Sequence, residues 1–280
     1  MKPPPFLFLS AARIINIVST VSNQLLAKRH GGEDMEKCKL FCLLLITVLP
    51  AAQLWATSTT SEDEIALALA NMLRAGRTVI ASNQAVINDP GTGKNLTGTK
   101  VRDAAIQVFK DKTGTNPDTI ISNNHYGKLL AIQIESITEV LDDNQSTINK
   151  AGINFKGFVP AVFARLVNER FREKIGSEAE IKVTAPINLV RNRKALPDKW
   201  EKSVITKQFS SSDWPKNKVF SQQAETGGRK AYRVLVPEYY SKNCLSCHGE
   251  PKGEIDITGY PKEGGMVGQL GGVISISLFH

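Results

Sequence analysis

Apolar residues recur every three or four positions between residues 61 and 175, which is the spacing of amphipathic helices. Ser61 is followed by three acids, and an N-cap residue with acids in the first turn predicts a long N-terminal helix that runs to about Ala85. Further helices are expected over residues 101–109, 125–141 and 160–174, separated by loops rich in turn residues at 88–99 and 112–118. Helices therefore dominate the first half of the chain.

The second half alternates between apolar and polar residues, which is the pattern of half-buried strands. Strands are expected over residues 181–187, 219–224, 231–236 and 271–278, with a short helix over 198–206. The segments 219–224 and 231–236 flank Gly227 and Gly228, which indicates a hairpin. A helical half followed by an antiparallel sheet predicts the α+β fold class.

Residues 35–56 have the three-part layout of a secretory signal peptide, with Lys37 and Lys39 before an apolar run and small residues up to Ala56. The apolar run, residues 40–52, is shorter than the roughly 20 residues that a membrane-spanning helix needs. We therefore expect a periplasmic protein with no membrane span after signal cleavage, or a membrane-anchored one if the signal is retained. Residues 1–34 are an upstream extension that does not fit this layout, so we expect Met35 to be the true start; a long, unusual n-region is the alternative. The functional domain is expected over residues 61–280.

The composition is that of a globular protein, with 280 residues, 41% of them hydrophobic and 22% charged. The formal net charge is +8, and residues 1–56 contribute six basic and three acidic side chains to it. The remaining basic residues are scattered and not interleaved with aromatic residues, so charge does not indicate nucleic-acid binding. Cys38 and Cys42 lie in the signal segment, which leaves Cys244 and Cys247 for the mature protein.

Cys244, Cys247 and His248 form a C-x-x-C-H motif, the strongest chemical signal in the chain. Two thiols separated by two residues can add across the two vinyl groups of haem, and the following histidine then lies under the iron as an axial ligand. This attachment takes place outside the cytoplasm, in agreement with the signal segment. We therefore expect one covalent haem c held by Cys244 and Cys247, with His248 on the iron.

Three other uses of the cysteine pair compete with haem attachment. A structural disulfide suits an exported protein but does not require His248. A thiol-redox site should open a helix after a strand, and Gly249 and Pro251 oppose a helix here. A zinc site needs a fourth ligand, for which the mature chain offers only His125 and His280 besides carboxylates.

The sixth iron ligand stays open, because each candidate also has a structural explanation. Met72 falls on the apolar face of a helix, where methionine usually fills core space. His125 lies at a polar helix start, and His280 ends the chain. Met266 lies in a Gly-rich loop 18 residues after His248, and an open or water-filled sixth position is the further alternative. Candidates for the haem propionates, or for solvated helix faces, are Arg74, Arg77, Arg165 and Arg170.

Five segments carry a family resemblance, at residues 156–164, 192–201, 233–237, 244–251 and 256–277. They resemble a bacterial family of extracytoplasmic c-type haem domains with a PAS-like fold, whose members stand alone or form the sensor half of signalling proteins. The resemblance implies a five-stranded PAS-like antiparallel sheet flanked by helices, with haem at its side. It also implies the haem-binding roles of Cys244, Cys247 and His248. It does not supply the sixth ligand, because the mature chain has no helix-borne cysteine that could serve as a thiolate.

Motif and resemblance together predict a periplasmic c-type haem-binding protein that senses redox state or a small ligand and has no output domain of its own. Such a sensor reports to a separate redox or signalling protein, and a homodimer through the long first helix is left open. The alternative is a single-haem electron-transfer protein of the cytochrome c kind. An enzyme such as a peroxidase ranks last, because it needs a proton-handling residue and the sequence offers His125 at best. We therefore expect no enzymatic activity.

Overall fold

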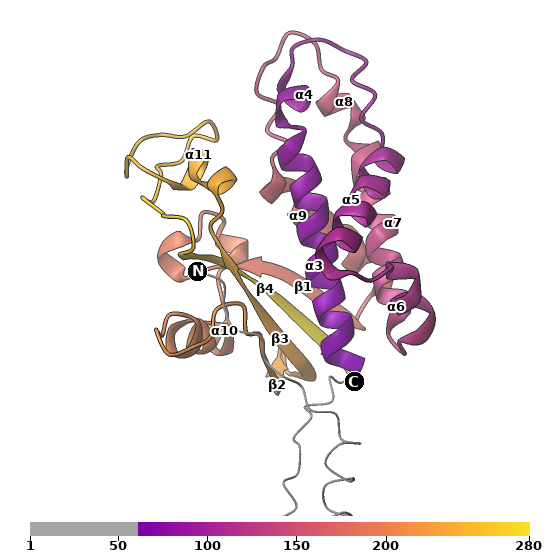
Figure 1. Ribbon diagram of the computed structural model, residues 1–280, viewed down its shortest axis with the longest axis vertical. Helices are drawn as coiled ribbons and strands as arrows, with labels where there is room; N and C mark the ends of the chain where they lie inside the picture. Colours follow the sequence, from indigo (N-terminus) through magenta and orange to yellow (C-terminus); the bar gives the residue numbers. More distant parts are fainter. Residues whose placement is uncertain (1–60) are drawn as a thin grey trace, which may run out of the picture. The chain divides into compact units, whose positions relative to one another are not determined.

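The structure is a computed structural model that describes residues 61–280, shown in Figure 1. The expectations for the extension 1–34 and the signal segment 35–56 lie outside these residues. The apolar period in the first half produces helices, as expected. They are α3 (Ser61–Ser82), α4 (Gln84–Asn88), α5 (Gly98–Thr113), α6 (Pro117–Asn123), α7 (Gly127–Asp143), α8 (Gln145–Ile148) and α9 (Pro160–Ile175).

Local chemistry decides where these helices begin and end. At the start of α5 the Thr97 side chain accepts a backbone hydrogen bond, and Gly114, with a φ of 70°, ends the same helix. α6 begins with Pro117 at its first position, in a stretch that we expected to be a loop. The helix that starts at Ser61 ends at Ser82 rather than near Ala85, and the short α4 follows it.

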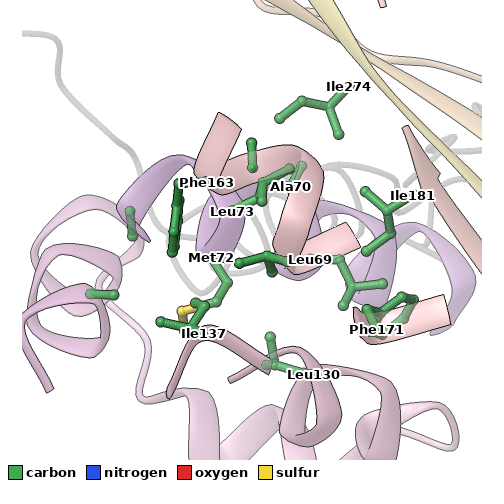
Figure 2. Close-up of a cluster of buried hydrophobic side chains, with 14 of the residues drawn as sticks. Leu69, Ala70, Met72, Leu73, Leu130, Ile137, Phe163, Phe171, Ile181 and Ile274 are labelled. Carbon is green, nitrogen blue, oxygen red and sulfur yellow. The ribbon is translucent and has the colours of Figure 1, made fainter. Parts of the chain in front are cut away.

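Helices α3, α5, α7 and α9 pack around one hydrophobic core, part of which is shown in Figure 2. Gly76 of α3 permits a close approach of α9, because a Cβ at this position would lie 2.9 Å from the ring of Phe163. Two sheet residues, Ile181 and Ile274, belong to the same cluster, so the helices cover one face of the sheet. The helical side chains labelled in Figure 2 are Leu69, Ala70, Met72, Leu73, Leu130, Ile137, Phe163 and Phe171.

The sheet contains β1 (Ala179–Thr184), β2 (Phe220–Thr226), β3 (Arg229–Tyr239) and β4 (Leu270–Phe279), all antiparallel, in the order β1-β4-β3-β2. The hairpin predicted at Gly227 and Gly228 is confirmed: both have positive φ, 57° and 76°, and they join β2 to β3. The mixed α+β class is confirmed as well. Among residues 61–280 the sheet has four strands, where the resemblance implied five.

Alternating side chains give the sheet a second buried face, covered by a layer formed from residues 187–218, here called the second layer. Leu235 of β3 and Val273 of β4 pack on this face against Val204, Ile205 and Phe209 of the second layer. The neighbouring strand residues 234, 236 and 274 point to the helices instead. The second layer contains η1 (Ile187–Leu189), η2 (Arg193–Ala195), α10 (Lys199–Val204) and η3 (Ile205–Phe209), a π-helical turn that continues α10.

A buried ionic cluster holds the second layer to the sheet. The Arg233 side chain of β3 is 2% exposed and donates to Asp198 at 2.7 Å and to Glu201 at 3.3 Å, at the start of α10. Glu201 also pairs with Lys182 of β1 at 2.6 Å, and the ring of Trp200 lies over the Arg233 guanidinium at 4.3 Å. A charge buried as deeply as Arg233 is tolerated because it is paired, so the position of α10 on the sheet is specific.

No helix within residues 61–280 is long and apolar enough to cross a membrane.

Candidate functional site

The three motif residues lie on consecutive helical turns directly after the end of β3. Cys244 ends η4 (Lys242–Cys244), and α11 (Leu245–His248) carries Cys247 and His248. Cys244 and Cys247 are three residues apart on this helical stretch, which places their side chains on one face. Both are free thiols and half-buried. α11 ends at His248, and the next residue is Gly249, where a Cβ would lie 2.6 Å from the carbonyl oxygen of Leu245. The helical stretch therefore ends with the motif.

The imidazole of His248 is oriented by a carboxylate and an aromatic ring. Its Nδ1 lies 2.8 Å from Oε2 of Glu263, and its ring stacks on that of Tyr240 with centroids 5.4 Å apart. Burial raises the pKa of Glu263, but the hydrogen bonds and charges of Arg191 and His248 outweigh this effect, and the pKa lies below its ordinary value. Because an ionised carboxylate only accepts hydrogen bonds, Nδ1 carries the proton and Nε2 is the ring nitrogen available to a metal.

Arg191 of the second layer joins the motif to the segment that follows it, residues 249–269. We call this segment the haem loop, after the haem that the sequence leads us to expect at the motif. Its guanidinium donates to Glu263 at 2.7 Å, to Asp256 at 2.6 Å and to the carbonyl oxygen of Cys247 at 2.8 Å. The Arg191 side chain is 19% exposed, and those of Asp256 and Glu263 are 0% and 15% exposed. These ion pairs and the Nη–carbonyl bond fix the haem loop relative to α11.

Backbone contacts bring the haem loop still closer to His248. The N–H of Gly265 donates to the carbonyl oxygen of His248 at 2.7 Å, and that of Gly264 donates to Gly249 at 3.2 Å. A Cβ at Gly265 would lie 2.5 Å from the ring of Tyr240, so only glycine fits between Tyr240 and α11. Burial raises the pKa of Tyr240 to about 12, with a further contribution from Glu263, so its phenol stays protonated at neutral pH.

The haem loop exposes an apolar surface. Among residues 61–280, five of the nine large apolar side chains that are exposed lie in the thirteen residues 255–267. An exposed apolar patch this concentrated is typical of a surface that another group or molecule covers. The five are Ile255, Ile257, Tyr260, Met266 and Val267, with exposed fractions between 46% and 62%.

A pair of arginines on α3 lies beside the end of β3, where the motif begins. Arg77 pairs with Glu238 at 2.7 Å, and Arg74 pairs with the same carboxylate at 3.2 Å. The pKa of Arg77 is raised chiefly by Glu238, and Cys244 adds to this, which places Arg77 within electrostatic reach of the motif. The other two propionate candidates are committed elsewhere: Arg165 pairs with Glu169, and Arg170 pairs with carboxylates of α7 and α9.

Of the four sixth-ligand candidates, the structure places one in a segment bonded to His248. Met266 lies in the haem loop directly after Gly265, with 58% of its surface exposed. Met72 is fully buried in the core between the helices, as Figure 2 shows, so its environment is that of a core residue. His125 is exposed between α6 and α7, and α6 lies on the opposite side of Figure 1 from α11. His280 follows β4 at the end of the strand remote from the haem loop.

Sequence reasoning identified the cysteines and His248 but missed Arg191, Tyr240, Asp256 and Glu263. Arg191 is 56 residues from Cys247 and 72 from Glu263 along the chain, and no local pattern marks such contacts. The sequence pointed to the haem loop only through the segment resemblance at 256–277 and the sixth-ligand candidate Met266. The zinc alternative gains no ligand set, because residues 61–280 contain no group of three or more His, Cys, Asp or Glu arranged to hold a metal.

The fold and the site define a class: a mixed α+β domain that presents a C-x-x-C-H motif on a helical turn at the end of a sheet strand. The family model described as Tll0287-like matches residues 59–278, which is most of the chain. The protein therefore belongs to the Tll0287-like family. No curated protein and no solved structure matches the chain.

Proposed function

We propose that this protein is an exported c-type haem protein, with haem joined to the thiols of Cys244 and Cys247. The observation that carries the proposal is the geometry of the motif: both thiols are free on one helical face, and His248 presents Nε2 because Glu263 takes Nδ1. The apolar surface of the haem loop suits a large apolar ring system, so the residues present fit haem. When bound, haem supplies an iron that exchanges single electrons or takes a small ligand.

The protein residues around His248 have defined tasks in this proposal. Glu263 accepts the Nδ1 proton, fixes the orientation of the ring and makes Nε2 a stronger electron donor. Arg191 pairs with the Glu263 carboxylate and donates to the carbonyl oxygen of Cys247. The same side chain therefore offsets the charge of Glu263 and holds the haem loop next to the motif. Tyr240 supports the imidazole face, and Met266 is the candidate for the sixth ligand.

We propose further that the domain is PAS-like and that it senses redox state or a small ligand, without an output domain of its own. The sensing idea is supported by the chain path: the haem loop is hydrogen-bonded to His248 and runs directly into β4, which pairs with both β1 and β3. A displacement of His248 would therefore reach the middle of the sheet. The partner that receives the signal would be a separate redox or signalling protein.

The second candidate is a single-haem electron-transfer protein. It is favoured by the exposure of the site, since the His248 side chain is 34% exposed and the surrounding loop is apolar at its surface. Electron exchange between proteins needs an accessible haem edge but no movement of the fold. The predicted signal segment 35–56 gives both candidates the same periplasmic location.

The test is a visible spectrum of the protein produced with a haem-attachment system, recorded oxidised, reduced, and reduced with carbon monoxide. A haem stain after denaturing electrophoresis shows whether the haem is covalent. The double variant Cys244→Ala/Cys247→Ala is the negative control, and Ser246→Ala in the same turn is the matched control that should stain like the wild type. Bands that shift with carbon monoxide favour the sensor, and sharp bands that do not shift favour the carrier. Absence of covalent haem in the wild-type protein would refute both.

A further inference from the structure

The net charge of the described chain is concentrated in the second layer. Residues 61–280 contain 29 basic and 24 acidic side chains, a net charge of +5. Residues 187–218 contain eight basic and three acidic side chains, which is the same net charge of +5. The rest of residues 61–280 is therefore neutral. The net positive charge of the described chain therefore belongs to one contiguous stretch, which the fold places on one face of the sheet.

The acids of the second layer offset little of this charge at its surface. The Glu201 side chain is 1% exposed, the Asp198 side chain, 37% exposed, is paired with Arg233 at 2.7 Å, and Asp213 is the remaining exposed acid. Within the part of the chain that the structure describes, none of the seven exposed basic residues lies within 4.0 Å of a carboxylate. They are Arg193, Lys194, Lys199, Lys202, Lys207, Lys216 and Lys218.

This basic surface is continuous with the candidate haem site. Arg191, between η1 and η2, donates to the carbonyl oxygen of Cys247 at 2.8 Å. Lys216, at the other end of the layer, donates to the carbonyl oxygen of Gly268 in the haem loop at 3.2 Å. In Figure 1, α11 lies at the upper left with α10 below it, and the helices α5 and α7 lie on the right. A molecule bound to the second layer would thus lie next to the motif.

We propose that the second layer is the docking surface for an acidic protein that exchanges electrons or signals with the candidate haem site. Exposed basic side chains that have no carboxylate partner attract an acidic protein over about one Debye length and orient it before contact. Ile187 and Leu196, exposed by 48% and 43%, supply apolar contact area among these charges. The exchange of electrons or signals rests on the proposed function, whereas the binding of an acidic protein does not.

The inward position of both tryptophans favours a protein over a membrane or a nucleic acid. Trp200 and Trp214 pack against the second face of the sheet, and their Nε1 atoms donate to Gln222 at 3.3 Å and to Lys218 at 2.9 Å. Both are partly buried, and the side chains of Arg233 and Lys218 lie over the rings of Trp200 and Trp214. Insertion into a membrane interface and stacking with bases both use exposed aromatic rings, which the exposed residues of 187–218 do not supply.

The test measures binding of the full exported chain to a plant-type [2Fe–2S] ferredoxin, used as a small acidic electron-transfer protein. The variant Lys199→Glu/Lys207→Glu reverses two charges of the second layer, and Lys100→Glu/Lys112→Glu reverses two exposed lysines of α5 as the matched control. At low ionic strength we expect the first variant to bind at least about 10-fold more weakly and the control to stay within about twofold of the wild type. Equal losses in the two variants would overturn the proposal.

A carbodiimide, which joins lysines to carboxylates, locates the contact independently. Cross-links to the ferredoxin should fall on the lysines of residues 187–218 and disappear at high salt. Cross-links spread evenly over α5 and the second layer would contradict a docking surface. So would equally tight binding to vesicles of 30% phosphatidylglycerol in phosphatidylcholine, or to a DNA duplex of 20 base pairs, because the surface would then recognise polyanions in general.

The same binding measurement on Cys244→Ala/Cys247→Ala separates this proposal from the proposed function. Binding should persist in this variant, since the basic surface does not include the cysteines. A wild-type protein that binds the ferredoxin but carries no covalent haem would refute the haem proposal and leave the docking surface supported. A haem-loaded protein that binds the ferredoxin no more tightly than the vesicles or the DNA duplex would refute the docking surface and leave the haem proposal supported.

Discussion

Replacement of Arg191 by methionine should release the haem loop. Methionine keeps much of the length and apolar contact of the arginine stem but removes the guanidinium. Asp256 and Glu263, 0% and 15% exposed, would then lose their ion pairs with it, and the carbonyl oxygen of Cys247 would lose a donor. Breaking a buried ion pair by removal of one partner costs about 3–5 kcal/mol, and the partial exposure of Arg191 and Glu263 places the expected loss near the lower value, ~3 kcal/mol.

The loss should be local, because the ion pairs of Arg191 join α11 and the haem loop and do not involve the helical core. A change of ~3 kcal/mol corresponds to an opening equilibrium shifted by about 100- to 200-fold. Hydrogen exchange read by mass spectrometry should show this shift in peptides from residues 249–269 and leave peptides of α3 and α7 unchanged. The control is Arg193→Met, because Arg193 is exposed, lies two residues away and has no carboxylate within 4.0 Å among the described residues. We expect this variant to change the free energy of loop opening by less than about 0.5 kcal/mol.

The pH dependence of loop protection gives a second measurement on the wild type. The pKa values of Asp256 and Glu263 are lowered by the hydrogen bonds they accept, although burial acts in the opposite direction. A carboxyl group with a lowered pKa stabilises the folded state above its unfolded value, about 4, and loses this effect as pH falls through the folded value. Protection of the loop should therefore be flat above about pH 5 and fall in more acid solution. If Arg191→Met exchanges within about threefold of the wild type at pH 7, the guanidinium does not hold the loop.

Three further variants test other parts of the site. His248→Ala should keep haem covalently attached through the cysteines but lose the native visible spectrum; an unchanged spectrum would exclude His248 as the axial ligand. Glu263→Gln removes a negative charge that would favour oxidised haem iron, so the reduction potential in a potentiometric titration should rise. Each 1.4 kcal/mol of lost preference for the oxidised state corresponds to about 60 mV. Gly265→Ala should destabilise the folded protein by about 1–3 kcal/mol in thermal unfolding, because the new Cβ would lie 2.5 Å from the Tyr240 ring. A melting temperature equal to that of the wild type would show that the backbone at this position can yield.

Features that depend on near neighbours in the chain were predicted well. The helices follow from the apolar period, the β2–β3 hairpin follows from Gly227 and Gly228, and α9 starts at Pro160 as its sequence indicates. One exception is α6: the turn-forming Asn116 and Pro117 predict a loop, and in the structure they form the start of a helix. The same residue types favour both outcomes, so the pattern alone does not separate them.

In the candidate site, too, local features follow from the sequence and long-range contacts do not. The C-x-x-C-H motif is a pattern over five consecutive positions, so the sequence by itself singles out Cys244, Cys247 and His248 as the candidate site residues. The Met72 candidate shows the limit of this reasoning, since an apolar helical position is the same pattern whether the methionine fills a core or faces a ligand. Only the packing of α3 against α7 and α9 decides between these uses.

Tertiary structure alone decided what surrounds the motif. Arg191 reaches Glu263 across 72 residues and Cys247 across 56, and Asp198 and Glu201 of the second layer pair with Arg233 of the sheet because of the way α10 lies on it. Such contacts depend on where distant segments meet when apolar faces are buried, and no local preference of the chain encodes that meeting point. Local sequence therefore determined the candidate motif, the basic stretch 187–218 and most of the helices and strands. The long-range burial of the sheet between two layers determined the orientation of His248, the anchoring of the haem loop and the position of the basic stretch beside it.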